Sequence, residues 1–292
     1  MTGAAAAAPS TTSTTSTAAT GAQDASAAVR AYWTPERMRE AKPTAVPAGE
    51  HKTLAAKGKP GSKPAAAPAI RRPANLAPDE VPSRLGKIFY VDPWDNSNRS
   101  CDGNALNSAS RILVITSASC AYSRAGHDWM RNWIFVPDTF RGSQPYGSFA
   151  AKQYIAFNAW VNDGSLNYDV AMVSTWNNQN NQRLVDAVGG DGLGWNWPRD
   201  MFVNSLGYSL QGFPSTCAGT TSALPDGRIQ MPCAPVGGGK ALGGPWLINI
   251  DPNTSLGTVD GVLSVTVNNG TIQSPYFTAE MKSMLDRIGS QT

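Results

Sequence analysis

Seven short runs rich in β-branched and aromatic residues, all after residue 81, constrain the fold of this chain more than any other feature. They read KIFYV, RILVIT, NWIFVP, VAMVST, MFVNSLGY, GPWLINI and GVLSVTV, and clusters of Gly, Asn, Asp and Pro separate them at turn-like intervals. Residues of these types favour strands, and many short strands without helical periodicity between them indicate a sandwich or barrels. We therefore predict an all-β protein over residues 81–292.

The C-terminus departs from the strand pattern. After Ser274-Pro275, four apolar residues recur at helical spacing: Phe277, Met281, Leu285 and Ile288. This period predicts an amphipathic α-helix that packs on the β core, with Gly289 as its C-cap.

Residues 1–80 have a different composition. Ala, Ser, Thr, Pro and Gly dominate, and large apolar side chains are too few to offset the entropy of ordering a backbone. We predict a mostly disordered arm, with a short helix near residues 34–42 marked by Thr34 as N-cap and Pro35 at the first helical position. Two interpretations of that helix remain open: a docking segment or propeptide remnant that packs on the folded part, or a transient helix in a disordered arm.

The charge of the chain is divided at the same boundary. Residues 1–80 carry ten Lys and Arg against six Asp and Glu, a net of +4, whereas residues 81–292 carry fourteen against fifteen, a net of −1. A nucleic-acid interface needs a concentrated basic face, so the near-neutral folded part argues against one. The basic arm is interpreted as a solvated linker, although a flexible basic segment can also touch anionic surfaces.

The four cysteines all lie after residue 81, and they are Cys101, Cys120, Cys217 and Cys233. Of the three possible pairings, the spacing favours Cys101 with Cys120 and Cys217 with Cys233. Each disulfide closes a modest loop and should stabilise the fold by roughly 3 kcal/mol. Disulfides indicate an oxidising compartment, and we expect a secreted protein. A zinc site is the alternative, but neither pair has the close spacing of a metal knuckle, and only His51 and His127 could assist. We expect no metal and no cofactor.

Targeting signals in the sequence are incomplete. Met1 is followed by TGAAAAAPS, without a charged n-region or a long apolar h-region, so a signal peptide is absent or truncated in this sequence. The chain also contains no run of about 18 apolar residues, and we expect no membrane span.

Three ordered blocks resemble the trypsin-like serine proteases. RILVITSASC resembles the strand and turn that normally read L-T-A-G-H-C, LNYDVAMV resembles the strand with the catalytic aspartate, and GKALGGPWL resembles the block with the nucleophilic serine. The chain is similar to the secreted bacterial V8-like or glutamyl-endopeptidase branch. The resemblance implies two antiparallel six-stranded β-barrels, an N-terminal one over about residues 81–176 and a C-terminal one, with the terminal helix, over about residues 183–292.

The same resemblance places the catalytic positions at Ser119, Asp169 and Leu242. A serine hydroxyl is not a base near neutral pH, and a leucine side chain has no lone pair for attack, so only Asp169 matches the triad of the family. The oxyanion hole would use the backbone N–H groups of Leu242 and Lys240, where the family usually has glycine at the second position.

Three further features of the sequence are candidates for functional roles. His127 beside Asp128 invites a dyad, but neighbouring residues of an extended strand point to opposite faces, so an exposed or packing histidine is the preferred interpretation. Trp195 and Trp197 could offer a stacking surface for a peptide or glycan, although tryptophans beside Gly and Pro are more often packing anchors. The run Asn177–Gln182 is interpreted as the polar connector between the two halves.

These observations predict a secreted trypsin-like pseudoprotease that binds a peptide or protein in the cleft between two barrels. We expect a monomer that binds no nucleic acid. Two alternatives stay open: an active serine endopeptidase whose catalytic groups lie elsewhere, and a structural or surface-interaction protein that acts through its basic arm.

Overall fold

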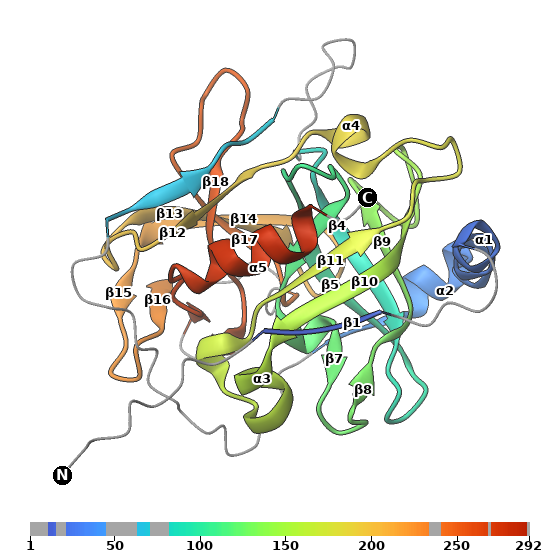
Figure 1. The fold of residues 1–292 in the computed structure, drawn as a ribbon, viewed down its shortest axis with the longest axis horizontal. Helices are drawn as coiled ribbons and strands as arrows, with labels where there is room; N and C mark the ends of the chain where they lie inside the picture. Colours follow the sequence, from blue (N-terminus) through green and yellow to red (C-terminus); the bar gives the residue numbers. More distant parts are fainter. Residues whose placement is uncertain are drawn as a thin grey trace.

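The computed structural model describes residues 11–15, 22–44, 63–70, 82–233, 241–267 and 270–290. Strands are the most abundant regular elements of this part of the chain, with a few short helices, and the fold is mostly β with a C-terminal helix, as predicted (Figure 1).

A closed barrel occupies the first half of the fold. Its six strands pair antiparallel in the order β10-β11-β6-β5-β4-β9, and β9 returns to pair with β10. The strands are β4 (Leu85–Val91), β5 (Asn98–Leu106), β6 (Leu113–Thr116), β9 (Arg131–Pro137), β10 (Phe149–Phe157) and β11 (Ala171–Thr175). A further strand, β1 (Thr11–Thr15), pairs with β10 from outside. The predicted first barrel is therefore present.

Short elements decorate this barrel. A small hairpin of β7 (Tyr122–Ser123) and β8 (Asp128–Trp129) follows the 3₁₀ turn η1 (Ala118–Cys120). The helix α3 (Asn158–Asp163) and the 3₁₀ turn η2 (Leu166–Tyr168) connect β10 to β11.

The second half contains two sheets rather than one continuous six-stranded sheet. The larger has the order β14-β13-β17-β18-β12-β3, and the smaller has the order β15-β16-β20-β19. Their strands are β3 (Ala65–Ala67), β12 (Gly192–Trp195), β13 (Phe202–Tyr208), β14 (Pro214–Thr220), β15 (Ser222–Ala223), β16 (Ile229–Pro232), β17 (Pro245–Ile248), β18 (Thr258–Val262), β19 (Val265–Val267) and β20 (Thr271–Ser274). The β12–β18 pair is parallel, which the expectation of purely antiparallel barrels missed.

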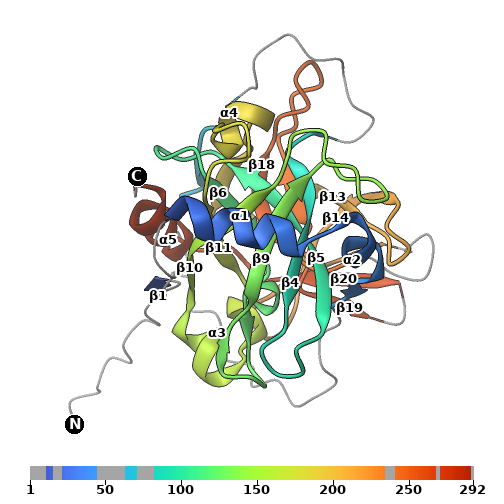
Figure 2. The same ribbon diagram turned by 90° about the vertical axis from the view of Figure 1, so that its right-hand side faces the viewer.

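The arm before the barrel is described over residues 22–44, where the short helix predicted near residues 34–42 is present and a second helix, which the sequence did not predict, precedes it. The arm forms α1 (Ala22–Tyr32), α2 (Pro35–Glu40) and β2 (Lys42–Pro43), which pairs parallel with β5. Thr34 caps α2 as expected, its Oγ1 accepting a hydrogen bond from the N–H of Arg37. Figure 2 shows both helices on the outer face of the barrel. The anchors are Trp33 and Met38, which are 2% and 4% exposed and pack with apolar residues of β4 and β9.

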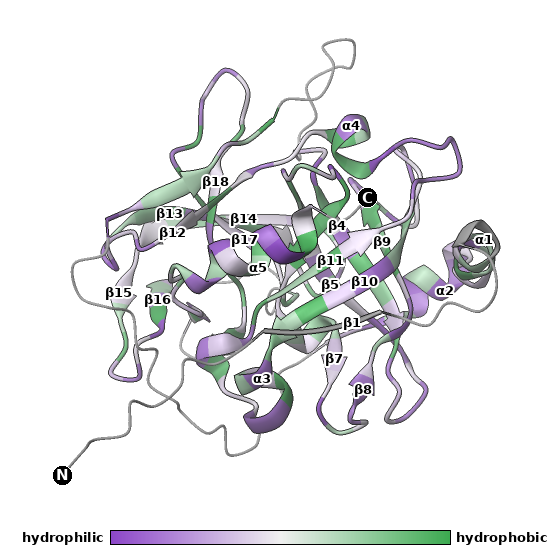
Figure 3. Cartoon of the chain, viewed as in Figure 1, coloured by the Kyte–Doolittle hydropathy of each residue, from purple (hydrophilic) through white to green (hydrophobic). Residues whose placement is uncertain are grey.

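The predicted C-terminal helix is confirmed as α5 (Glu280–Gly289). All four residues that predicted it, from Phe277 to Ile288, are buried. Gly289 is the last helical residue and Ser290 is the C-cap, one residue beyond the expected position. Hydrophobic and hydrophilic residues alternate along α5 in Figure 3, while the strands around the barrel centre are largely hydrophobic.

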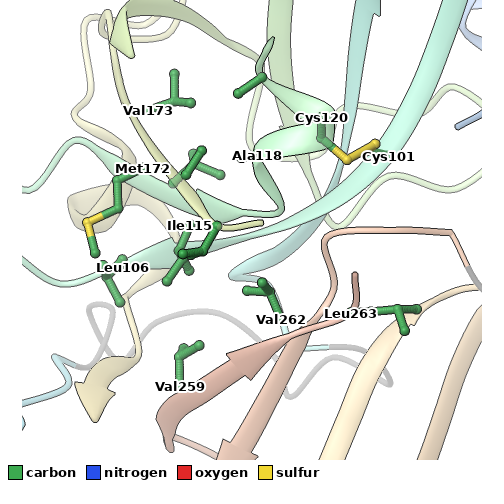
Figure 4. Packing of buried hydrophobic residues seen from close by; sticks show 14 of the residues in the cluster. Cys101, Leu106, Ile115, Ala118, Cys120, Met172, Val173, Val259, Val262 and Leu263 are labelled. Atoms are coloured by element: carbon green, nitrogen blue, oxygen red, sulfur yellow. A yellow bond between two sulfur atoms is a disulfide. The ribbon is translucent and has the colours of Figure 1, made fainter. Parts of the chain in front are cut away.

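Both predicted disulfides are confirmed, Cys101–Cys120 and Cys217–Cys233. Cys101–Cys120 joins β5 to η1, and Figure 4 shows it beside the apolar core. The same view shows Leu106, Ile115 and Met172 of the first barrel near Val259 and Val262 of β18. One apolar core therefore runs between the two halves and holds the segments that converge on the candidate site.

Candidate functional site

Asp169 lies at the centre of the candidate site. It follows η2 and is 0% exposed, and its carboxylate accepts three hydrogen bonds within the described part of the chain. Ser119 donates its backbone N–H to Oδ1 over 2.7 Å and its hydroxyl to Oδ2 over 3.3 Å, and the Ser264 hydroxyl donates to Oδ2 over 2.5 Å. The structure thus brings Ser119 and Asp169 together, two of the three residues that the sequence placed in the site.

Ser119 is held in place by its own turn. It is the central residue of η1, directly after β6, and its Oγ lies 3.0 Å from the Oγ of Ser117. The next residue, Cys120, carries the disulfide to Cys101, which ties the turn to β5. The hydroxyl of Ser119 therefore has fixed partners in a buried network, and its side chain is directed at the Asp169 carboxylate.

Leu242 reaches the same region through its backbone. Its carbonyl accepts a 2.7 Å hydrogen bond from the N–H of Asp102 in β5, and the N–H of Gly243 donates to the carbonyl of Leu263 over 2.7 Å. Leu263 directly precedes Ser264, whose hydroxyl donates to Asp169. The turn that contains Leu242 is therefore hydrogen-bonded next to a residue that contacts Asp169. The Leu242 side chain is 3% exposed and belongs to the apolar core.

Gly243 shows why this turn needs glycine. Its φ is +89°, in the left-handed region that a side chain disfavours. A Cβ there would also lie 2.2 Å from the carbonyl oxygen of Asp102 and 2.1 Å from the Oγ1 of Thr116, which itself donates to that carbonyl. The turn, β5 and the end of β6 are therefore in direct contact.

Burial dominates the electrostatics of Asp169. It raises the pKa of the carboxyl to about 6, and the hydrogen bonds from Ser264 and Ser119 oppose the rise. A buried carboxylate surrounded by hydroxyl and amide donors is stable without an adjacent cation. The described side chains that donate to Asp169 are those of serines, and none of them is an imidazole.

The three predicted positions are closed to solvent. Ser119 is 7% exposed, Leu242 is 3% exposed and Asp169 is 0% exposed. All three side chains are therefore buried in this structure.

Other residues singled out from the sequence lie apart from this cluster. His127 is exposed in the turn between β7 and β8, with a φ of +49°. Its neighbour Asp128 pairs with Arg131 over 3.1 Å and accepts the N–H of Trp129, so these contacts give no support to a His127–Asp128 dyad. His51 and Lys240 lie outside the described residues, and so does the expected oxyanion contribution of Lys240.

The two tryptophans of the Gly-rich turn serve packing. Trp195 is 8% exposed in β12, and the carbonyl of Trp197 accepts the hydroxyl of Tyr276 over 2.7 Å. Trp195 therefore offers no open stacking surface.

Two residues of the site escaped the sequence analysis. Ser264 binds Asp169, and the only signal for it was a serine inside the strand-like run GVLSVTV. Asp102 is 0% exposed; its Oδ2 accepts the N–H of Tyr208 over 2.6 Å, which links the first barrel to β13. Asp102 lies between a cysteine and a glycine, and this local sequence is more typical of a turn than of a buried strand.

Among the described residues, no group of three or more His, Cys, Asp and Glu is placed to hold a metal ion. The helices of the described ranges are too short or too polar to cross a membrane.

The structure has a trypsin-like fold of the chymotrypsin clan, defined by the barrel, the second-half sheets, the C-terminal helix and the cluster around Asp169.

Solved structures agree with this assignment. The chain is similar to a thermostable serine protease from an extremophilic microorganism, with 22% identity over 72% of this chain and 99% of that one and a TM-score of 0.64. It is similar to the protease Anisep from Arthrobacter nicotinovorans, with 27% identity, coverage of 76% and 100% and a TM-score of 0.64. A Glu endopeptidase matches at 17% identity and a TM-score of 0.56, covering 77% of this chain and 98% of that one. No family model and no curated protein matches the chain. The fold is thus that of serine proteases, and the two disulfides indicate an extracellular protein.

Proposed function

We propose that this protein is a secreted pseudoprotease, close to the bacterial V8-like branch of the trypsin-like clan, that binds a peptide or protein without cleaving it. The observation that carries the proposal is the side chain at the nucleophile position. Leu242 is aliphatic, is 3% exposed and lies in the turn that would present a serine. Bond cleavage in this class begins with attack by a hydroxyl oxygen, which leucine lacks.

The contacts of Asp169 support the same conclusion. In a working triad the carboxylate orients an imidazole, whereas here Ser119 and Ser264 donate to it. The hydrogen bonds from the serines offset part of the cost of burying this carboxylate. The similarity to Anisep supports a protease-related ancestry for the chain.

An edge strand beside the site offers a place for a peptide. The strand β19 begins directly after Ser264 and ends the four-stranded sheet, so one side of its backbone has no neighbouring strand in that sheet. Its residues are half-exposed. An extended peptide can add to such an edge through main-chain hydrogen bonds.

Labelling of the purified chain with a fluorophosphonate tests the absence of catalysis. We expect no covalent adduct and no digestion of casein, with an active trypsin-like protease as positive control. Stoichiometric labelling that a serine-protease inhibitor prevents would overturn the proposal.

A double substitution tests whether only the reacting groups are missing. Ser119→His with Leu242→Ser restores an imidazole and a hydroxyl, and we expect weak labelling of this variant. Ser119→His with Leu242→Ala is the matched control, because it has the imidazole and the smaller side chain but no hydroxyl. Circular dichroism establishes that both variants are folded.

Peptides selected from a displayed random library test the binding function. We expect Val265→Lys in β19 to weaken their binding at least about ten-fold, because charged side chains on an edge strand oppose strand addition. Ser222→Lys is the matched control, since it places the same charge on β15 at the opposite edge of the sheet. A library that yields no binder, or binding that only Ser222→Lys weakens, contradicts the assignment.

A further inference from the structure

A cavity of about 470 Å³ lies beside the first barrel, away from the cluster around Asp169. Four parts of the chain form it: the helix α1, the loop before β6, the strand β10, and the end of β11 with the connector that leads to α4 (Leu184–Val188). Its lining includes Arg30, Lys152, Trp176, Asn178 and Arg183. A volume of this size suits a small ligand or a short stretch of a chain-like one.

The lining of the cavity is cationic. Arg30, Lys152 and Arg183 contribute positive charge, and no carboxylate is among the described residues that line it. The nearby Asp186 is shared between two guanidinium groups, at 2.8 Å from Arg111 and 2.6 Å from Arg183. One carboxylate for two arginines leaves an excess of positive charge at this end of the cavity.

Arg30 adds a charge that is partly withdrawn from water. Burial lowers its pKa, yet an arginine stays protonated at any physiological pH. Its Nη1 donates to the carbonyl of Asn177 over 3.4 Å, a neutral partner at a long distance. A bound anion would supply a stronger, charge-assisted partner.

The connector contributes amides that are already ordered. The Oδ1 of Asn178 accepts the N–H groups of Asn180 and Gln182 over 3.0 and 2.9 Å, and its Nδ2 donates to the carbonyl of Tyr146 over 3.0 Å. Asn177 donates to the Oδ1 of Asn181 over 2.9 Å. The polar connector is therefore a fixed loop. Binding a ligand to it costs little further conformational entropy, because the loop is already ordered.

An indole forms part of the lining and orients a cation. The Nζ of Lys152 lies 4.7 Å from the ring centroid of Trp176, a cation–π geometry that fixes the ammonium at the cavity. Cations, amides and an indole together match the groups of an acidic sugar, which presents carboxylates, hydroxyls and an apolar ring face.

We propose that this cavity binds an acidic saccharide that carries uronic-acid carboxylates. Arg30, Lys152 and Arg183 pair with the carboxylates, and the ordered connector keeps the cavity in shape. The two disulfides favour a polysaccharide over a nucleotide, because they place the protein where cell-surface and wall polymers are abundant. The site shares no residue with β19 or with the Asp169 cluster, so its failure and the failure of the proposed peptide function are separate results.

Isothermal titration of the full chain with tetragalacturonate tests the proposal, and the fully methyl-esterified tetramer is the neutral ligand control. We expect binding of the acid alone, and an affinity that falls as salt is added. Arg30→Gln and Lys152→Gln should each weaken binding about ten-fold or more, in line with the loss of one charge-assisted hydrogen bond. Lys282→Gln on α5 is the matched protein control, because it removes a surface charge from a helix that does not line the cavity.

Several results would overturn the assignment. They are the absence of binding, equal affinity for the acid and its methyl ester, and equal weakening by Lys282→Gln and Lys152→Gln. Adenosine monophosphate is titrated in parallel, and a tighter fit of the nucleotide would replace the saccharide by a phosphate ligand. Thermal melts of the two cavity variants establish that each is folded.

Discussion

The hydroxyl of Ser264 donates to the Oδ2 of Asp169 over 2.5 Å, so a residue of the second half of the fold satisfies a carboxylate of the first. Together with the two bonds from Ser119, it replaces the ion pair that a buried carboxylate usually needs. The cluster thereby links the two halves of the fold.

Asp169→Asn should change the pH dependence of stability. Burial raises the pKa of Asp169 to about 6, above the value of about 4 in an unfolded chain. Folding then favours the protonated form, so the contribution of Asp169 is full below about pH 4 and is lost as the pH rises through about 6. The free energy of unfolding of the wild type, relative to Asp169→Asn, should fall by about 3 kcal/mol between about pH 4 and 7.

Urea denaturation of both proteins across this range measures the effect. Asp186→Asn provides a control of opposite sign: its burial acts to raise the pKa, but hydrogen bonds from Arg111 and Arg183 outweigh this and lower it. The stability due to Asp186 is therefore lost as the pH falls. A pH-independent difference for Asp169→Asn would show that folding does not raise the pKa of Asp169.

Gly243→Ala should destabilise the fold far more than Gly212→Ala. Both glycines have a positive φ, +89° and +83°, so both substitutions incur roughly 1–2 kcal/mol of backbone strain. Only at Gly243 would the new Cβ also collide with the carbonyl of Asp102, whereas nothing lies within 4 Å of the one at Gly212. Thermal denaturation should show a clearly larger loss for Gly243→Ala, and equal losses would mean that the turn can move away from β5.

Trp33→Ala should release the arm from the barrel while the barrel stays folded. Trp33 is 2% exposed and its Nε1 donates to the carbonyl of Asn132, and truncating a buried tryptophan costs about 3–5 kcal/mol. Trypsin should then cleave faster after Arg37 and Arg39, which mass spectrometry of the fragments detects. Trp94→Ala, at a side chain 67% exposed, should leave the cleavage rate unchanged.

The two disulfides should differ in their accessibility to reductant. Cys101 and Cys120 are both 0% exposed, whereas Cys217 is half-buried in β14. Dithiothreitol under native conditions should therefore reduce Cys217–Cys233 first, and alkylation followed by mass spectrometry identifies the order. Replacing either pair by alanines should cost roughly 3 kcal/mol in the free energy of unfolding. Prior reduction of Cys101–Cys120 would indicate that β5 and η1 open readily.

The sequence predicted the elements whose side chains carry a clear period or a strong strand preference. α5 was visible because its apolar residues recur every three to four positions, and β4, β6, β9 and β11 were visible as apolar runs. The disulfide pairing followed from spacing alone. The fold class followed from these elements and from the three protease-like blocks.

β5 shows why other elements were missed. Its sequence, NRSCDGNAL, resembles a turn, yet Asp102 and Asn104 are fully buried. Distant partners satisfy them: Asp102 accepts the N–H of Tyr208, and Asn104 donates to Asp191 over 3.0 Å. Such partners are invisible in a local pattern, and the same holds for Ser264. For a related reason the packing of the arm stayed open between a docking segment and a transient helix, because the apolar face of β4 and β9 that receives Trp33 and Met38 is not visible in the sequence of the arm.

The contacts of the arm have a consequence for any shortened form of the protein. Residues Ala65–Ala67 cover the outer side of β12, pairing with Leu193, Gly194 and Trp195. A chain that started at residue 82 would leave this strand with a bare row of amide and carbonyl groups and an apolar sequence. Uncovered strand margins of this kind recruit other chains, so we expect the trimmed protein to self-associate and precipitate while its core remains folded.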